Sequence, residues 1–162
     1  MTKKECEKCE FPKNPAKAEA RLHINSFLMG GLLTVLALIF TFSPEKFHIM
    51  VVAQLALAIP LILFASLSYA KVGYKENHTV WDRFGWIATN LGYILFLNAS
   101  GLILAAFSFK ILTIIYFGLV MLLVSIYYIL NIISQKDTLK EHLSKLILWL
   151  IGIFIGGILP LM

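Results

Sequence analysis

The sequence predicts an all-α integral membrane protein, a compact bundle of about five transmembrane helices. Of its 162 residues, 59% are hydrophobic and only 14% are charged, whereas soluble domains are about 45–50% apolar and about 25% charged. The mean hydropathy is +0.83. The apolar residues also gather into runs that approach or exceed the ~20 residues needed to cross a bilayer. We place the spans at residues 26–42, 48–69, 84–107, 109–134 and 144–162, which form one transmembrane domain over 26–162.

Lys and Arg alternate between the two ends of these spans. From the N-terminal segment to the C-terminus, the connections carry six, one, three, one, three and no basic residues. Because basic loops stay on the cytoplasmic side, this alternation predicts a multi-pass protein of the cell membrane with its N-terminus inside and its C-terminus outside. It also explains the net charge of +5 without nucleic acid as a partner. The expected partners are the lipid bilayer and a second copy or another membrane protein.

Residues 1–25 are expected to form a polar cytoplasmic segment that contains a short helix. Asn14-Pro15 is a favourable helix start, with Asn as the N-cap and Pro at the first helical position. The helix should run from Pro15 to about Ile24, along the inner surface or onward into the first span.

The N-terminal segment also holds the pair Cys6 and Cys9. A Cys-x-x-Cys pair supplies half of a tetrahedral zinc site, and His23 lies at the distance of a third ligand. No second His follows at a finger-like spacing, so one chain offers three ligands at most, and a second protomer could complete the set. The alternatives are a redox-active pair and a plain solvated tail; otherwise the sequence predicts no cofactor.

Span three is the most informative stretch, because its polar residues share one half of a helix. At about 100° per residue, Thr89, Asn90, Tyr93, Asn98 and Ser100 lie in one half-turn together with Gly101. The apolar half is expected to face lipid. Since unpaired polar groups are costly in hydrocarbon, the polar half should face protein or a water-filled space. A break of the helix near Ser100-Gly101 is an alternative, as in transporters.

Other spans add polar residues to this face. The further candidates for solute contact are Gln54 in span two and Thr113, Tyr116 and Asn131 in span four. Hydrogen bonding between helices explains the same residue types without any solute.

Small residues recur at helical spacing in spans one and five. Gly30, Thr34, Ala37 and Thr41 share one face of the first span, and Gly152 and Gly156 form a Gly-x-x-x-Gly pair in the fifth. Such faces permit close contact between helices, within the chain or between chains. By contrast, the turn at Ser108-Phe-Lys110 reverses the chain without Gly or Pro.

These patterns favour one function and leave a second open. The interiors of the predicted spans lack Asp, Glu, His and Cys, so catalysis within the membrane is the weakest hypothesis. We expect passage of a small neutral or backbone-coordinated solute along the polar face of span three, in an oligomer because five helices make a thin wall. The alternative is a non-catalytic accessory or assembly subunit of a membrane complex.

Overall fold

In the computed structural model, residues 15–42, 47, 49–72, 78–134 and 139–162 are described, and these residues form helices and turns without a strand. The helices are α2 (Pro15–Phe42), α3 (Ile49–Val72), α4 (His78–Ala106), α5 (Lys110–Ser134) and α6 (Leu139–Ile153), which continues into the π-helical η4 (Phe154–Ile158) and the 3-10 turn η5 (Leu159–Leu161). Helices α2 to α5, and α6 together with η4 and η5, each contain a stretch long and apolar enough to cross a membrane. The predicted all-helical multi-pass fold is therefore confirmed.

Helix α2 joins the N-terminal helix and the first span into one element. It runs without interruption from Pro15 to Phe42, a length of 28 residues. At about 1.5 Å per residue, it is roughly 42 Å long and exceeds the hydrocarbon thickness. Arg21 and Asn25 thereby lie on the same rigid helix as the apolar residues that follow them.

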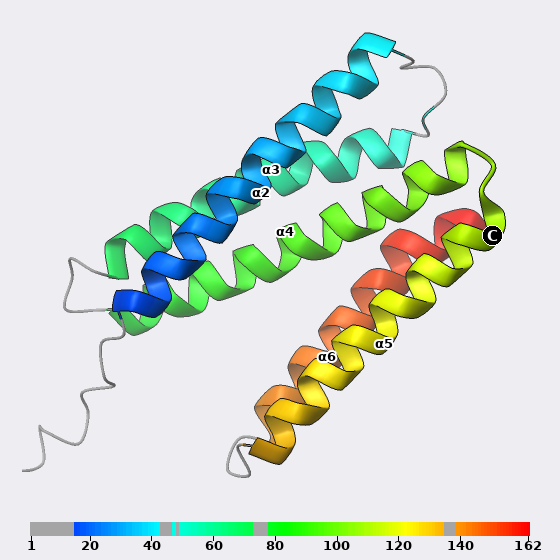
Figure 1. Cartoon of the computed structure of the whole chain (residues 1–162). Helices are drawn as coiled ribbons and strands as arrows, with labels where there is room; N and C mark the ends of the chain where they lie inside the picture. Colours follow the sequence, from blue (N-terminus) through cyan, green and yellow to red (C-terminus); the bar gives the residue numbers. More distant parts are fainter. Residues whose placement is uncertain (1–14, 43–46, 48, 73–77, 135–138) are drawn as a thin grey trace, which may run out of the picture.

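The helices form two groups that share α4. Figure 1 shows α2 and α3 beside α4, whereas α5 and α6 form a pair that diverges from α4 toward the lower end of the view. One apolar core lies among α2, α3 and α4, and includes Leu32, Leu55 and Ala99. A second core lies among α4, α5 and α6, and includes Ile94, Phe117 and Ile153. Helix α4 is thus the central helix of the bundle.

The central position of α4 corrects one expectation. Its apolar half was expected to face lipid, yet Ala99 is 0% exposed and Leu102 is 6% exposed. Both pack into the core that α4 shares with α2 and α3. The helical wheel separated polar from apolar residues, but it could not show that neighbouring helices cover part of the apolar half as well.

Small residues on α4 allow α3 to approach closely. A Cβ atom added at Gly92 would lie 2.7 Å from Cγ1 of Ile62, and one added at Gly85 would lie 3.0 Å from Cε1 of Tyr69. Ala88, between the two glycines, is also buried. The two helices therefore pack with side chains of α3 directly against the backbone of α4.

The α4–α5 turn is closed by a serine in the left-handed region. Ser108 has a φ of 66°. Its N–H donates to the carbonyl of Ala105 at 2.9 Å, and the N–H of Phe109 donates to the carbonyl of Leu104 at 3.3 Å. These two bonds make a Schellman motif, in which glycine is the usual left-handed residue. The chain reverses here without Gly or Pro because Ser108 adopts a conformation that most residues avoid.

Glycines of two helices enclose the ring of Phe117 on α5. A Cβ atom at Gly101 of α4 would lie 2.3 Å from Cζ of Phe117, and one at Gly157 of η4 would lie 2.3 Å from its Cε1. Phe117 is only 3% exposed. The three elements therefore meet around one aromatic ring, near the end of the bundle that holds the α4–α5 turn.

Candidate functional site

A large cavity lies between α4 and the α5–α6 pair, at the end of the bundle opposite the α4–α5 turn. Its volume is about 1040 Å³, at the upper end of the range of small-molecule sites. We call this end the basic end, because Arg21, Arg83 and Lys145 all line the cavity there. Figure 1 shows that α4 and the α5–α6 pair are farthest apart toward this end.

The charges on the cavity wall are unequal. Against the three cations, the only carboxylate among the described lining residues is that of Asp82, and His142 adds a titratable imidazole. Arg21 donates a hydrogen bond to Oδ1 of Asp82 at 2.8 Å, and its guanidinium also lies 5.0 Å from the ring centre of Tyr69. Among the described lining residues, cations therefore outnumber carboxylates by three to one. The arrangement favours an anion.

Aromatic side chains line the same cavity. They are Trp86, Tyr93, Tyr127, Tyr128 and Trp149. Nζ of Lys145 lies 4.7 Å from the ring centre of Trp86, a cation–π contact between α6 and α4. Rings with a polar edge suit a boundary between water and hydrocarbon. The cavity therefore combines cations with amphipathic rings.

One side-chain hydrogen bond joins the two helix groups across the cavity. Nε1 of Trp149 on α6 donates to Oδ1 of Asn90 on α4 at 2.8 Å. Nδ2 of Asn90 donates to the carbonyl of Trp86 at 2.6 Å, which fixes the orientation of the amide. Asn90 thereby holds a cavity-lining indole in place.

A buried polar cluster lies behind the cavity, between α2, α3 and α4. Asn25 is 0% exposed. Its Nδ2 donates to Oγ1 of Thr89 at 3.4 Å, and its Oδ1 accepts a bond from the hydroxyl of Tyr93 at 3.1 Å. The Thr89 hydroxyl in turn lies 3.5 Å from that of Tyr69. These bonds satisfy polar groups that would otherwise be costly inside the bundle.

The predicted solute-contacting residues divide into two groups. Asn90, Tyr93 and Asn131 line the cavity, and Thr89 belongs to the cluster behind it. The other members lie deeper or elsewhere, and each with a polar side chain bonds to a backbone carbonyl: Gln54 to Gly156 (2.7 Å), Asn98 to Gly152 (3.0 Å), Ser100 to Phe96 (2.9 Å), Thr113 to Phe109 (3.0 Å) and Tyr116 to Leu97 (3.1 Å). Gly101 packs against Phe117.

Three members of the deeper group form contacts between helices, whereas Ser100 and Thr113 bond to carbonyls four residues earlier in the chain. Gln54 reaches η4 from α3, Asn98 reaches α6 from α4, and Tyr116 reaches α4 from α5. The α4 helix is continuous through Ser100 and Gly101. Oε1 of Gln54 and Oδ1 of Asn98 are buried without a hydrogen-bond partner among the described residues.

The two predicted small-residue faces have different surroundings. Gly152 and Gly156 face α4, where an added Cβ would lie 2.9 Å from Ile94 and 2.3 Å from Nδ2 of Asn98, respectively. The face of Gly30, Thr34, Ala37 and Thr41 is exposed, and nothing lies within 4 Å of a Cβ placed at Gly30. Contact of that face with another chain stays a prediction.

Several residues of the site were not predicted from the sequence. They are Asn25, which lies behind the cavity, and Trp86, Lys145 and Trp149, which line it. The sequence did contain a pattern that could have indicated them. Trp86 and Asn90 are four residues apart on one helix, as are Lys145 and Trp149 on another, so each pair shares a helix face. Only the packing of α6 against α4 shows that the two pairs meet.

The zinc prediction lies mostly outside the described residues, because Cys6 and Cys9 are not among them. His23 is exposed, and its Nε2 lies 3.8 Å from Glu19. Among the residues that the structure describes, no group of three or more His, Cys, Asp or Glu side chains could hold a metal ion.

Comparisons of the chain with protein-family models, curated proteins and solved structures find no match.

Proposed function

We propose that this membrane protein binds a small molecule with an anionic group in the cavity at its basic end, as the first step of its passage into or across the membrane. The observation that supports this proposal is the cavity of about 1040 Å³ with cations on both helix groups and one carboxylate between them. Three of the polar residues that the sequence assigned to a solute, Asn90, Tyr93 and Asn131, lie on its wall. The sequence predicted a neutral or backbone-coordinated solute; because cations predominate on the described wall, we propose an anionic one instead.

The proposed orientation places this cavity at the cytoplasmic side. Arg83 and Lys145 belong to the connections that the alternation of basic residues assigns to the inside. A molecule would therefore enter from the cytoplasm or from the inner half of the bilayer.

Passage beyond the cavity requires movement of the α5–α6 pair. Ile94, Phe117 and Ile153 are buried and fill the space among α4, α5 and α6 on the side nearer the α4–α5 turn. The connection between α4 and α5 at residues 107–109 is short, and α4 and the α5–α6 pair already diverge from this turn toward the basic end (Figure 1). We propose that the pair pivots at this turn, and that the second core loosens when the bound molecule advances.

Anion entry can be tested with the tryptophans of the cavity. The chain has three tryptophans, and Trp86 and Trp149 line the cavity. In a Trp81→Phe background, quenching of the remaining emission by iodide should exceed quenching by caesium, because the wall attracts anions. Lys145→Gln should lower the ratio of iodide quenching to caesium quenching about twofold. Lys110→Gln should leave that ratio unchanged, because Lys110 lies at the α4–α5 turn, at the end of the bundle away from the cavity. Equal quenching by the two ions would contradict the proposal.

Flux is a separate measurement. Proteoliposomes should take up an organic phosphate faster than empty liposomes, and Arg83→Gln with Lys145→Gln should lower the uptake at least fivefold. Uptake at the rate of empty liposomes would restrict the function to binding.

The assembly role is the second proposal, and the exposed face of α2 supports it. Gly30, Thr34, Ala37 and Thr41 present small side chains to the outside. Cysteine at Thr34 in a chain whose two native cysteines are replaced by serine should crosslink to a partner or second copy. Cysteine at Ile115, which is 58% exposed on α5, is the control; equal crosslinking at both positions would argue against a specific face.

A further inference from the structure

We infer that the molecule bound at the basic end is a lipid-like amphiphile, with a phosphate head in the cavity and an apolar chain in an adjoining groove between α2 and α4. This inference rests on the proposed function and specifies its ligand. Four features of the structure support it: the groove, its junction with the cavity, the charge of the cavity and the exposure of the groove.

The groove is a second, smaller hollow of about 240 Å³. It is lined by Ile24, Phe27 and Leu28 of α2 and by Tyr93, Phe96 and Leu97 of α4. The hydroxyl of Tyr93 is the one polar side-chain group among these residues, and it is bonded to Asn25 at 3.1 Å. The surface left for a ligand is therefore apolar.

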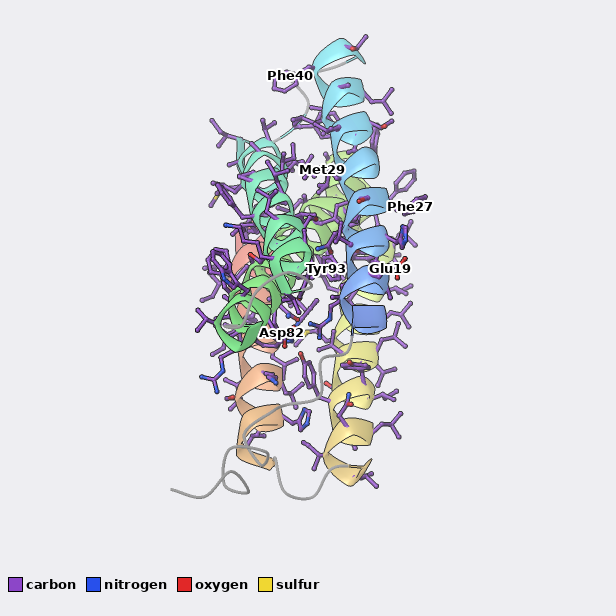
Figure 2. All side chains as sticks on the ribbon, turned by 90° about the vertical axis from the view of Figure 1, so that its left-hand side faces the viewer. Glu19, Phe27, Met29, Phe40, Asp82 and Tyr93 are labelled. Carbon is purple, nitrogen blue, oxygen red and sulfur yellow. The ribbon has the colours of Figure 1, made fainter. Side chains whose placement is uncertain are left out.

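Tyr93 joins the groove to the cavity, because it lines both. In Figure 2 the label of Tyr93 lies between α4 and α2, and Phe27 projects outward from α2. The Tyr93–Asn25 hydrogen bond holds the tyrosine between the two hollows. A molecule that passes this ring would have its polar part beside Arg21 and Asn90 and its apolar part beside Phe96.

The cavity's charge selects the chemistry of the head. A phosphate accepts several charge-assisted hydrogen bonds at once, and arginine matches it with a planar fork of donors. Arg21 bonds to Asp82 at 2.8 Å, and Arg83 on α4 and Lys145 on α6 line the same cavity. A phosphate head can pair with these cations, whereas a neutral head cannot, and a simple inorganic ion would leave the groove empty.

The exposure of the groove indicates how the ligand arrives. Phe27 is 87% exposed and Ile24 is 56% exposed, so in a membrane this side meets the hydrocarbon. The aromatic residues of the cavity suit the boundary between hydrocarbon and head groups. A lipid could slide sideways into both hollows without its chain crossing water.

Binding of phosphatidate to the full-length protein tests the inference. The protein is placed in phosphatidylcholine nanodiscs, and a minor fraction of phosphatidate is introduced while emission of Trp86 and Trp149 is followed in the Trp81→Phe background. Phosphatidate should change the emission in a saturable manner, whereas added phosphatidylcholine should not. The double variant Arg83→Gln with Lys145→Gln should weaken the apparent affinity about tenfold or more, because loss of either charge-assisted contact would by itself produce a change of that size.

A groove variant separates a lipid from a free anion. Leu97→Trp should fill the groove and weaken phosphatidate about tenfold, while water-soluble glycerol phosphate should be unaffected. To keep the emission of Trp86 and Trp149 interpretable, bound phosphatidate is counted by native mass spectrometry in this variant. Leu119→Trp, at an exposed position of α5, is the matched control for an added indole, and circular dichroism verifies that both variants fold.

Each outcome decides between the proposals. Weakening by both the charge and the groove variants supports the lipid. Equal binding of glycerol phosphate and phosphatidate, unaffected by Leu97→Trp, overturns the lipid and leaves the anion-binding function intact. Equal binding of phosphatidate and phosphatidylcholine, unaffected by the charge variants, overturns both.

Discussion

Replacing Gly157 by alanine should destabilise the protein more than its small size suggests. The added Cβ would lie 2.3 Å from Cε1 of Phe117, 2.7 Å from its Cζ and 2.8 Å from Oδ1 of Asn98. Contacts between carbon atoms are favourable only at about 3.5–4 Å. The ring would have to retreat by more than 1 Å, but Gly101 also lies close to it, since a Cβ atom there would be 2.3 Å from Cζ of Phe117.

The expected magnitude follows from two opposed terms. Overpacking a core costs about 1–3 kcal/mol, and the upper half of that range applies because Phe117 is buried and two glycines already lie close to its ring. Alanine gains about 1 kcal/mol over glycine in a helix. Gly157→Ala should therefore lower the free energy of unfolding by about 1–2 kcal/mol.

Gly118→Ala is the matched control. Gly118 lies on the exposed side of α5, and nothing lies within 4 Å of its added Cβ. This variant should be neutral or gain up to about 1 kcal/mol. The two glycine variants should thus differ by about 1–3 kcal/mol, or about 5- to 150-fold in the unfolding equilibrium constant.

Unfolding in mixed micelles, titrated with dodecyl sulfate and followed by tryptophan emission, measures this difference. Phe117→Leu removes the clashing ring atoms, so it should rescue Gly157→Ala and give a coupling energy of about 1–2 kcal/mol in a double-mutant cycle. Equal stability of the two alanine variants, or strict additivity with Phe117→Leu, would refute the reasoning.

The same titration tests three further predictions. Ser108→Gly should stabilise the protein by about 1 kcal/mol, because glycine adopts a φ of 66° without the steric cost that serine bears; no gain would argue against strain in this turn. Asn98→Ala should lose about 0.6–1.7 kcal/mol with the bond to Gly152, and unchanged stability would show that the bond contributes nothing. Arg21→Gln and Asp82→Asn should couple by at most about 1 kcal/mol, since Asp82 is 52% exposed, and a coupling that does not fall with added salt would contradict this weak pairing.

The fold was predictable because the bilayer imposes strong rules on sequence. A helix is the structure that satisfies its own backbone in lipid, so apolar runs of sufficient length specify helices. The Asn14-Pro15 pair also predicted the beginning of α2 at Pro15. The closure of the α4–α5 turn was not predictable, because a residue such as Ser108 rarely adopts a left-handed φ.

The site was predictable only in part, because helical periodicity describes one helix at a time. It placed Asn90, Tyr93 and Asn98 on one face of α4, yet these three residues meet different neighbours: Trp149, Asn25 and Gly152. Whether a polar side chain lines a cavity or bonds a helix depends on the divergence of α5 and α6 from α4. No pattern within one span records that angle.

The bonds along α4 suggest why a cavity can exist at one end of this bundle. Near the α4–α5 turn, glycines at positions 152, 156 and 157 bring η4 and α6 against α4, and the amides of Gln54 and Asn98 fasten them. Toward the basic end, the Trp149–Asn90 bond and the Lys145–Trp86 contact span the two groups. Both pairs are contributed by residues that line the cavity. A ligand phosphate that draws Lys145 away from Trp86 would remove one of the contacts between α6 and α4 at this end. If the α5–α6 pair pivots as proposed, binding and opening would then be coupled through the same side chains.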